Sequence, residues 1–382
     1  MKTERGLSMS IFVVVLCAAL LIIVSAIHQW KLMILLVVLF AASAGVLVWY
    51  TAKINPDIAD RKEIESVHIV FGIEKKALLK DLEFQEILRK KYGLVIKGTK
   101  TDALAVPEGD LQSIDGFWPS SAWAEALFKL IHPELLYKTH TVFNTPLVIF
   151  SWAEVVEELI KQGVIEKKNR QYVIPDMKKF LSLEEQTYQS LRIPRLQGPI
   201  SVQSADPRQD TSGLLFIGAR AVVLNRGNIP DEKEIARILP EILKICKGMG
   251  KAESSADILF DRYIKQGQSR YPMISGCENQ VIEYYNIFPR YQEMIRTQIR
   301  VIFPEPAVLS EHPFIALTKK GELLLTALQD PDIQKLAWKK FGFRSGAEND
   351  PGDLKAIGLP EHAEPATSMP SAEVMKKIVE AM

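Results

Sequence analysis

Two long apolar runs open the chain. Residues 7–27 and 32–50 contain no charged side chain, and each run is close to the ~20 residues that cross a bilayer as a helix. A short polar break, His28–Lys31, separates them, and aromatic residues lie near their ends, where membrane surfaces favour them. We therefore expect residues 1–56 to form an N-terminal membrane anchor, a transmembrane helical hairpin held in the lipid bilayer.

A cleaved signal peptide is the alternative for the first run. Lys2 and Arg5 precede it, and Val24–Ala26 resembles a small-residue cleavage site. The run is longer than the ~7–15 residues of a signal-peptide core, which favours the hairpin.

The charges beside these runs leave the side of the membrane open. Lys53, Arg61 and Lys62, together with the two N-terminal charges, outnumber Lys31 in the turn. The positive-inside rule would then place the following domain in the cytoplasm. Cleavage after Ala26, or an inverted hairpin, would place it outside the cell.

A different pattern begins near residue 63, where short β-branched runs alternate with segments of helical spacing. Val67–Phe71 and Thr145–Phe150 predict strands, and Glu74–Tyr92, Asp231–Cys246 and Glu322–Phe341 predict helices. Further helices are expected at Ala122–Ile131, Trp152–Gly163, Pro175–Leu191 and Ser254–Gln266, and further strands at Pro199–Gln203, Arg300–Phe303 and Phe314–Leu317. This alternation favours a largely parallel α/β architecture.

Composition excludes several classes of partner. Lysine and arginine number 47 and aspartate and glutamate 46, so no overall charge attracts nucleic acid. Three cysteines, without CxxC or Cys/His zinc spacing, support neither a disulfide framework nor a metal site. Cys246 and Cys277 could pair, but two free thiols are the simpler interpretation. We expect no nucleic-acid partner, no metal and no cofactor.

The stretch Ser204–Gly213 is the first candidate binding site. It follows the predicted strand Pro199–Gln203 and precedes an apolar helical run that starts at Leu214. The first N–H groups of a helix lack intrahelical partners and can hold an oxygen-rich ligand, and α/β proteins bind ligands beyond the carboxyl ends of their strands. Ser120 and Ser121 begin another predicted helix, where either serine could act as a cap alone or could also offer its hydroxyl to a ligand.

Several stretches of the chain, taken together, match the sequence pattern of one known protein family. They are Phe71–Lys76, Trp118–Ser121, Ser204–Pro207 with Ser212–Gly213, Gly276–Gln280 and Leu325–Phe343. Together they resemble bacterial extracellular solute-binding proteins of the type 2 periplasmic binding fold. The similarity spans roughly Glu65–Gly346, and its most specific parts are the turn from Asp-Pro to Ser-Gly and the last of these helices.

The resemblance implies an α/β fold of two lobes, joined by two crossing strands and closing on a ligand held between them. The crossings would fall near Val148–Ser151 and Val301–Ala307. The implied order is residues 57–150 for the first part of lobe 1, residues 151–303 for lobe 2, residues 304–346 for the completion of lobe 1, and residues 347–382 for a tail with a short C-terminal helix.

The same resemblance implies the ligand-binding residues. Lobe 1 would supply Gly72, Glu74, Ser120 and Ser121, lobe 2 would supply Asp210, Thr211, Ser212 and Gly213, and the turn before a further helix would supply Glu278 and Asn279. Family members often have serine where this chain has Ile73, and asparagine where it has Thr211, so the resemblance does not assign the ligand.

Three polar residues of these stretches have competing interpretations. Glu278 could accept hydrogen bonds from a cationic or hydroxylated ligand, brace the hinge by binding backbone amides, or cap the helix that follows. Arg208 and Arg220 could pair with an anionic ligand or remain solvated on the surface. Helix N-termini favour an oxyanion, with a polar organic solute as the alternative.

These observations favour a binding protein over an enzyme. The chain has no GxSxG, HExxH, P-loop or GxGxxG motif, and a hydrolase built on Ser120 would need a base that the sequence does not identify. We expect a solute-binding protein anchored in the bacterial inner membrane, with its soluble domain extracytoplasmic, that captures a small polar or anionic ligand for a membrane transporter. The alternative is a membrane-held sensor or adaptor that signals to a partner protein.

Overall fold

The computed structural model describes residues 15–19, 21, 34–45, 64–107, 111–135, 138–193, 195–248, 252–346, 349–362 and 367–382. Contacts divide the chain into two units, Met1–Glu63 and Ile64–Met382. The described residues of the first unit are helical. No helix within the described ranges combines the length and the apolar content needed to cross a bilayer. The proposed hairpin at residues 7–27 and 32–50 falls largely outside those ranges.

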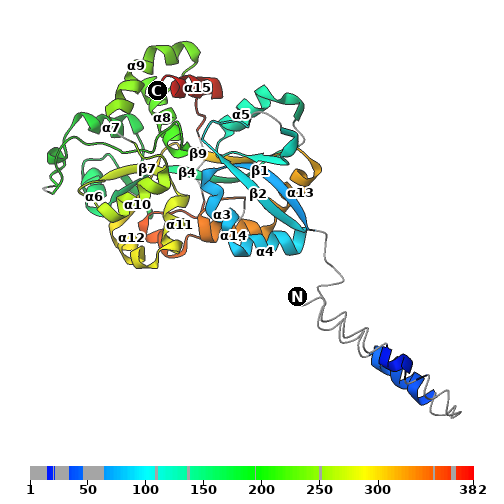
Figure 1. Cartoon of the computed structure of the whole chain (residues 1–382). Helices are drawn as coiled ribbons and strands as arrows, with labels where there is room; N and C mark the ends of the chain where they lie inside the picture. The colour runs from blue at the N-terminus through cyan, green and yellow to red at the C-terminus, as the bar shows by residue number, and fades with distance from the viewer. Residues whose placement is uncertain are drawn as a thin grey trace. The chain divides into compact units, whose positions relative to one another are not determined.

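The first lobe of the second unit is built on a five-stranded sheet (Figure 1). Its strands are β2 (Leu94–Thr101), β1 (Glu65–Gly72), β3 (Gly116–Trp118), β9 (Leu309–Ala316) and the first part of β4 (Lys138–Trp152), in that order. Strand β1 runs parallel to β2 and β3, whereas β9 is antiparallel to both of its neighbours. Helices α3 (Lys76–Lys80), α4 (Leu82–Ile87), α5 (Ala122–Ile131), α13 (Lys319–Leu328) and α14 (Pro331–Phe341) belong to this lobe.

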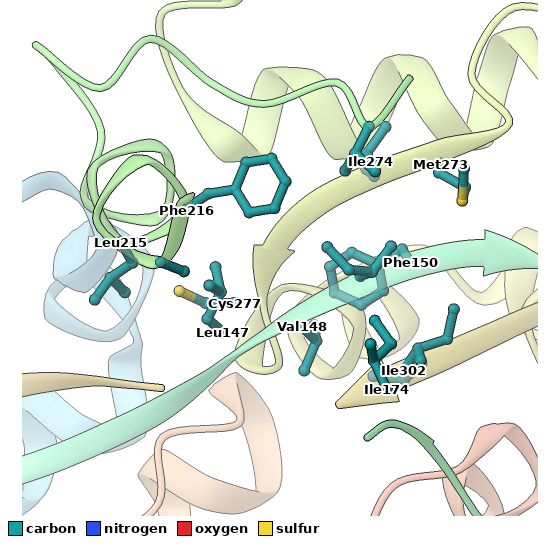
Figure 2. Packing of buried hydrophobic residues seen from close by; sticks show 14 of the residues in the cluster. Leu147, Val148, Phe150, Ile174, Leu215, Phe216, Met273, Ile274, Cys277 and Ile302 are labelled. Carbon is teal, nitrogen blue, oxygen red and sulfur yellow. The ribbon is translucent and has the colours of Figure 1, made fainter. Parts of the chain in front are cut away.

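The second lobe is built on the other part of β4. Strands β7 (Met273–Cys277) and β8 (Ile299–Pro304) pair with it on either side, and β6 (Gln171–Ile174) and β5 (Glu166–Lys168) continue beyond β8. Its helices are α6 (Ala153–Lys161), α7 (Met177–Leu181), α8 (Thr211–Leu224), α9 (Glu232–Gly248), α10 (Ala256–Gln266), α11 (Asn279–Ile287) and α12 (Gln292–Gln298). Figure 2 shows the buried core of this lobe, with Leu147 of β4 beside Cys277 of β7.

Strand β4 connects the two lobes. Its residues 138–146 pair with β9 in the first sheet, and its residues 147–152 pair with β7 and β8 in the second. The chain returns from β8 to β9 through the short stretch after Pro304. Two neighbouring crossings therefore join two separately packed sheets, which is the arrangement that permits hinge motion between lobes.

The structure differs from the sequence predictions at three elements. The sheets are mixed, not largely parallel, because the return crossing brings β9 into the first sheet antiparallel to both neighbours. The helix expected at Pro175–Leu191 is only α7 followed by short 3₁₀ turns, since Thr187 leaves helical geometry to pair with Pro199. The strand expected at Pro199–Gln203 is reduced to isolated bridges, of which Gln203 with Ile274 is one.

The helix expected at Glu322–Phe341 is two helices, α13 and α14. Asp330 caps the second helix by accepting from the Asp332 N–H at 2.8 Å, and Pro331 occupies its first turn, where no N–H is needed. Gly342, at a φ of +72°, ends it in the left-handed conformation that glycine adopts without strain. A local cap thus divides a continuous apolar pattern.

The C-terminal segment packs on both lobes. A 3₁₀ turn at Gly352–Ile357 packs against α12 and β8 of the second lobe. Helix α15 (Ala372–Glu380) then packs against α5 of lobe 1 and α9 of lobe 2, as Figure 1 shows. The indole N–H of Trp123 donates to the Pro370 carbonyl at 2.7 Å and fixes the approach to this helix. The expected tail is therefore an integral part of the fold.

Candidate functional site

The lobe 1 side of the junction between the lobes is a network around Lys75. Strand β1 ends at Gly72, and the next turn directs Lys75 into the interior, where it is 0% exposed. Its ammonium donates to the Pro119 carbonyl at 2.8 Å and to Ser120 Oγ at 2.5 Å, and Ser120 in turn donates to Glu74. The carboxyl ends of β1 and β3 are therefore joined by side chains.

Gly72 is required by this network. A Cβ atom at this position would lie 2.0 Å from Ser120 Oγ and 3.0 Å from a Glu74 carboxylate oxygen. Three predicted site residues, Gly72, Glu74 and Ser120, are thus brought together. Ser120 has no free hydrogen of its own to offer a ligand while it donates to Glu74.

Burial changes the protonation of two groups here. It lowers the pKa of Lys75 to about 7, against the opposing effect of the Glu74 charge. His312 of β9 is buried beside it, and burial together with the Lys75 charge lowers its pKa. Lys75 is the base near Ser120 that the sequence did not identify. Because Ser120 is only 3% exposed, the hydroxyl is closed off from an incoming substrate.

The lobe 2 side begins with Asp210, which joins two helix N-termini. Its carboxylate accepts from the Ser212 N–H at 2.9 Å, from Ser212 Oγ at 2.6 Å and from the Ala256 N–H at 2.8 Å. Burial and the Glu74 charge raise the pKa of Asp210 to about 6. Glu74 belongs to lobe 1, so its charge acts on a carboxyl group of the other lobe.

The turn before α8 packs tightly against the helix. A Cβ at Gly213 would lie 2.3 Å from the Ala205 carbonyl oxygen, so only glycine fits. Thr211 and Ser204 are buried there, and their hydroxyl groups have no hydrogen-bond partner within the described ranges. These two hydroxyls are the uncommitted polar groups of the predicted turn.

Glu278 and Asn279 are committed to the crossing strands. The Arg344 guanidinium donates to both Glu278 carboxylate oxygens, at 2.5 and 2.8 Å, and both side chains are almost wholly buried. The Asn279 N–H donates to Thr145 Oγ1 at 3.2 Å, on β4. Of the alternatives for Glu278, the helix cap is not formed, since its side chain makes no cap bond to α11, and its carboxylate is held by a guanidinium instead of by backbone amides.

Ser121 is directed away from Ser120. Its hydroxyl caps α5 by accepting from the Ala124 N–H at 3.2 Å and donates to the Ala103 carbonyl at 3.3 Å. It lines a cavity of about 380 Å³ that also includes Leu215, Ser310 and Met369. The two adjacent serines therefore serve different environments.

The two candidate anion-binding arginines are occupied. Arg208 makes a bidentate pair with Asp206, and its side chain is half exposed. Arg220 is buried and pairs with Glu184 at 2.6 and 2.7 Å. Cys246 and Cys277 are free thiols. No cluster of metal-binding side chains occurs among the described residues.

A second cavity, of about 400 Å³, lies between α10 and α11, and its residues were not predicted as a site. They are Asp257, Ile258, Phe260, Asp261, Arg262, Gln280, Glu283, Tyr284, Ile287 and Phe288. The Glu74 charge of lobe 1 raises the pKa of Asp257, which lines this cavity. Gln280, Glu283 and Tyr284 share one face of a helix by their spacing, which is the sequence signal that could have pointed to it.

Searches with the sequence alone find no relative: no protein-family model matches, and neither does any curated protein. Comparison of structures does. A periplasmic thiamin binding protein aligns over 82% of this chain and 94% of its own, with 11% identity and a TM-score of 0.53. The fold is that of a periplasmic binding protein. A protein described as an extracellular solute-binding protein from Bordetella parapertussis aligns over 85% of this chain and 97% of its own, with 10% identity and a TM-score of 0.52.

The structural similarity concerns the architecture that surrounds the candidate site. The periplasmic binding protein fold consists of two lobes joined by crossing strands, as β4 and the β8–β9 connection join them here. Both structures are named for binding and neither for a reaction. At 10–11% identity the likeness defines the architecture and leaves the ligand to the side chains of this chain.

Proposed function

We propose that residues 64–382 form a solute-binding domain that captures a small polar ligand between its lobes, without catalysing a reaction. The observation that carries this proposal is the two-lobed architecture, in which β4 and the β8–β9 connection join two sheets. The Glu74 charge of lobe 1 also acts on Asp210, which joins the N-termini of α8 and α10 in lobe 2. A ligand that contacts both lobes binds the closed arrangement better and shifts the population toward it. The fold comparison supports the same role.

The predicted site residues fall into two groups within this proposal. The ligand-binding candidates are Glu74, Thr211 and the turn Ser212–Gly213, with Gly72 and Ser120 positioning Glu74. Ser121, Asp210, Glu278 and Asn279 hold the surrounding helices and crossings through their own hydrogen bonds. Burial of these positioning groups keeps the junction in one geometry.

Membrane attachment and location belong to the same proposal. Residues 7–27 and 32–50 would anchor the protein as a hairpin in the bacterial inner membrane, with the binding domain extracytoplasmic and delivering its ligand to a membrane transporter. Fusion after Met382 of reporters that work only inside or only outside the cell tests this location. Activity of the cytoplasmic reporter alone would reject the transport role.

A sensor is the second candidate function, and one observation favours it. Helix α15 contacts a helix of each lobe, so closure of the lobes changes the surface around it. A partner protein that binds this surface would distinguish the liganded protein from the unliganded one. In that case the cytoplasmic reporter would be active and ligand binding would persist.

A thermal-shift screen of the full chain in detergent tests ligand binding. The panel contains oxyanions, sugars, amino acids, organic cations and thiamin, the last because of the structural neighbour. A ligand at about 100 times its Kd adds about 2.7 kcal/mol to the free energy of unfolding. Glu74→Gln should reduce the shift, whereas Glu86→Gln, an exposed carboxylate paired with Lys90 on α4, should not. Equal shifts in all three proteins would reject the proposed junction site.

A further inference from the structure

The cavity between α10 and α11 contains two acidic side chains without opposite charges. Asp261 is balanced by Lys265 at 2.8 Å, and Arg262 is paired with Glu253. Asp257 and Glu283 have no ion-pair partner within the part of the chain that the structure describes. The Lys76 charge of lobe 1 lowers the pKa of Asp257 without forming an ion pair with it among the described residues.

The two carboxyl groups resist being ionised together. The Asp257 charge adds to burial in raising the pKa of Glu283 to about 8, and burial and the Glu74 charge raise the pKa of Asp257. Asp257 lines the cavity and is exposed to solvent, whereas Glu283 is only partly exposed. A cation bound between them would favour the ionised form of both groups.

A buried amide provides an independent indication of a ligand. Gln280 is only 7% exposed and lines the cavity. Its Oε1 accepts from the Cys277 N–H at 2.8 Å, which fixes the amide, and a Cβ at Gly276 would collide with that oxygen at 2.2 Å. Its Nε2 interacts with the Asp257 carboxyl and lowers its pKa, but this contact falls outside hydrogen-bond geometry, and Nε2 makes no other hydrogen bond within the described ranges. A buried donor whose hydrogen bonding is incomplete has free energy to gain from a ligand acceptor beside Asp257.

The remaining walls are apolar and aromatic. Phe260 and Tyr284 are buried, with ring centroids 5.3 Å apart, and Phe288 lies 4.5 Å from Tyr284. Aromatic rings attract cations through their faces, and a volume of about 400 Å³ lies in the range of small-molecule sites. Carboxylates, ring faces and one amide donor therefore suit a positively charged organic molecule that carries an oxygen or nitrogen acceptor.

We propose that the ligand of this protein is an organic cation and that its positively charged nitrogen binds in this recess between Asp257 and Glu283. The inference rests on the proposed binding function and names the class of its ligand. It replaces the oxyanion favoured by the helix N-termini, because Arg208 and Arg220 are both paired with carboxylates.

Matched pairs of probes test the charge requirement on the full chain. Putrescine and 1,4-butanediol have similar length but differ in charge, and so do choline and 3,3-dimethylbutanol. At equal concentration at least one cation should raise the melting temperature, and the neutral partner should not. Phosphate and sulfate form the anion arm. Shifts with the anions but not with the cations would overturn the inference while leaving the proposed binding function intact.

The double variant Asp257→Asn/Glu283→Gln tests the location. Its affinity for the active cation should fall by roughly tenfold or more, because the pairing charges are lost. The unliganded variant should be more stable than the wild type, since the repulsion is gone, and this distinguishes it from a misfolded protein. Glu86→Gln is the matched control, and it should leave both measurements unchanged. Unchanged cation affinity in the double variant, or no response of the wild type to either cation, would overturn the recess as the site.

Discussion

The two sides of the junction between the lobes differ in how their polar groups are satisfied. On lobe 1, Lys75 and Ser120 donate hydrogen bonds to neighbouring residues of the same lobe. On lobe 2, Asp257 and Glu283 line a cavity and have no ion-pair partner among the described residues, and the Gln280 Nε2 makes no hydrogen bond there. A satisfied network fixes geometry, whereas an unsatisfied one has free energy to gain from a ligand. The contrast separates the rigid side of the site from the side that recognises charge.

The largest expected effect concerns Lys75 on the rigid, lobe 1 side, which should make the free energy of unfolding depend on pH. Its folded pKa of about 7 lies below the usual 10.5, so the folded state binds fewer protons between these values and the free energy of unfolding rises with pH across that window. The rise is on the order of 4 kcal/mol. Lys75→Met should remove it, as measured by urea unfolding from pH 7 to 10. Lys80→Met, at an exposed position, is the control, and an equal rise in Lys75→Met would refute the buried state.

Gly72→Ala tests the packing of the same network. The new methyl group would meet Ser120 Oγ, so Ser120 must turn away from Glu74 and Lys75. We expect a loss of about 1–3 kcal/mol in the free energy of unfolding. The control is Gly198→Asn, at an open turn with a φ of +82°, which should lower the free energy of unfolding by less. Gly98 would not serve as a control, because a Cβ there would collide with the Phe71 ring. An unchanged free energy of unfolding in Gly72→Ala would mean that the hydrogen-bond network around Ser120 rearranges at no cost, which would contradict this prediction.

On the recognition side, Glu283→Gln should stabilise the unliganded protein. The folded pKa of Glu283, about 8, lies above the usual 4.5, so wild-type stability falls as pH rises from 4.5 through 8. The glutamine variant lacks this fall, and the difference should grow to roughly 1–3 kcal/mol at pH 8. Chemical unfolding at pH 5 and pH 8 measures it. A constant difference at both values would contradict a neutral, buried carboxyl.

The smallest expected effect is that of Thr211→Val. The Thr211 hydroxyl is buried and makes no hydrogen bond, so an isosteric methyl group should stabilise the unliganded fold by up to about 1 kcal/mol. If the hydroxyl contacts the ligand, the same variant should weaken binding. Isothermal titration and thermal unfolding of one preparation separate the two results. A loss of stability would reveal a partner for this hydroxyl.

Features that depend on neighbouring residues were predictable from the sequence. The Ser121 cap of α5 and the Asp210 cap of α8 follow from residue types at helix starts. The resemblance to solute-binding proteins also anticipated the architecture seen in the structural comparison, and it placed Gly72, Glu74 and Ser120 in one site. The split at Asp330-Pro331 carried a local signal too, although the continuous apolar spacing concealed it.

Features that depend on distant parts of the chain were not predictable. Glu278 meets Arg344 across 66 residues, and this pair occupies a side chain expected to be available to a ligand. The burial of Lys75 follows from the packing of β3 and β9, which no local pattern reveals. The recess of Asp257 and Glu283 exists only because α10 and α11 are adjacent, and its effect is to reverse the sign of charge expected in the ligand.

Helix α15 has a consequence for kinetics. Val374, Met375 and Ile378 are almost completely buried where the helix packs against α5 and α9, and Lys377 pairs with Glu232 at the start of α9. A rotation that separates α5 from α9 must uncover part of this apolar surface, and each such side chain contributes ~1.5–3 kcal/mol when fully buried. The last helix therefore resists opening of the lobes at a point remote from the ligand. Shortening the chain before Ser371 should speed ligand release more than it weakens capture, so residence time and specificity are encoded in different parts of the molecule.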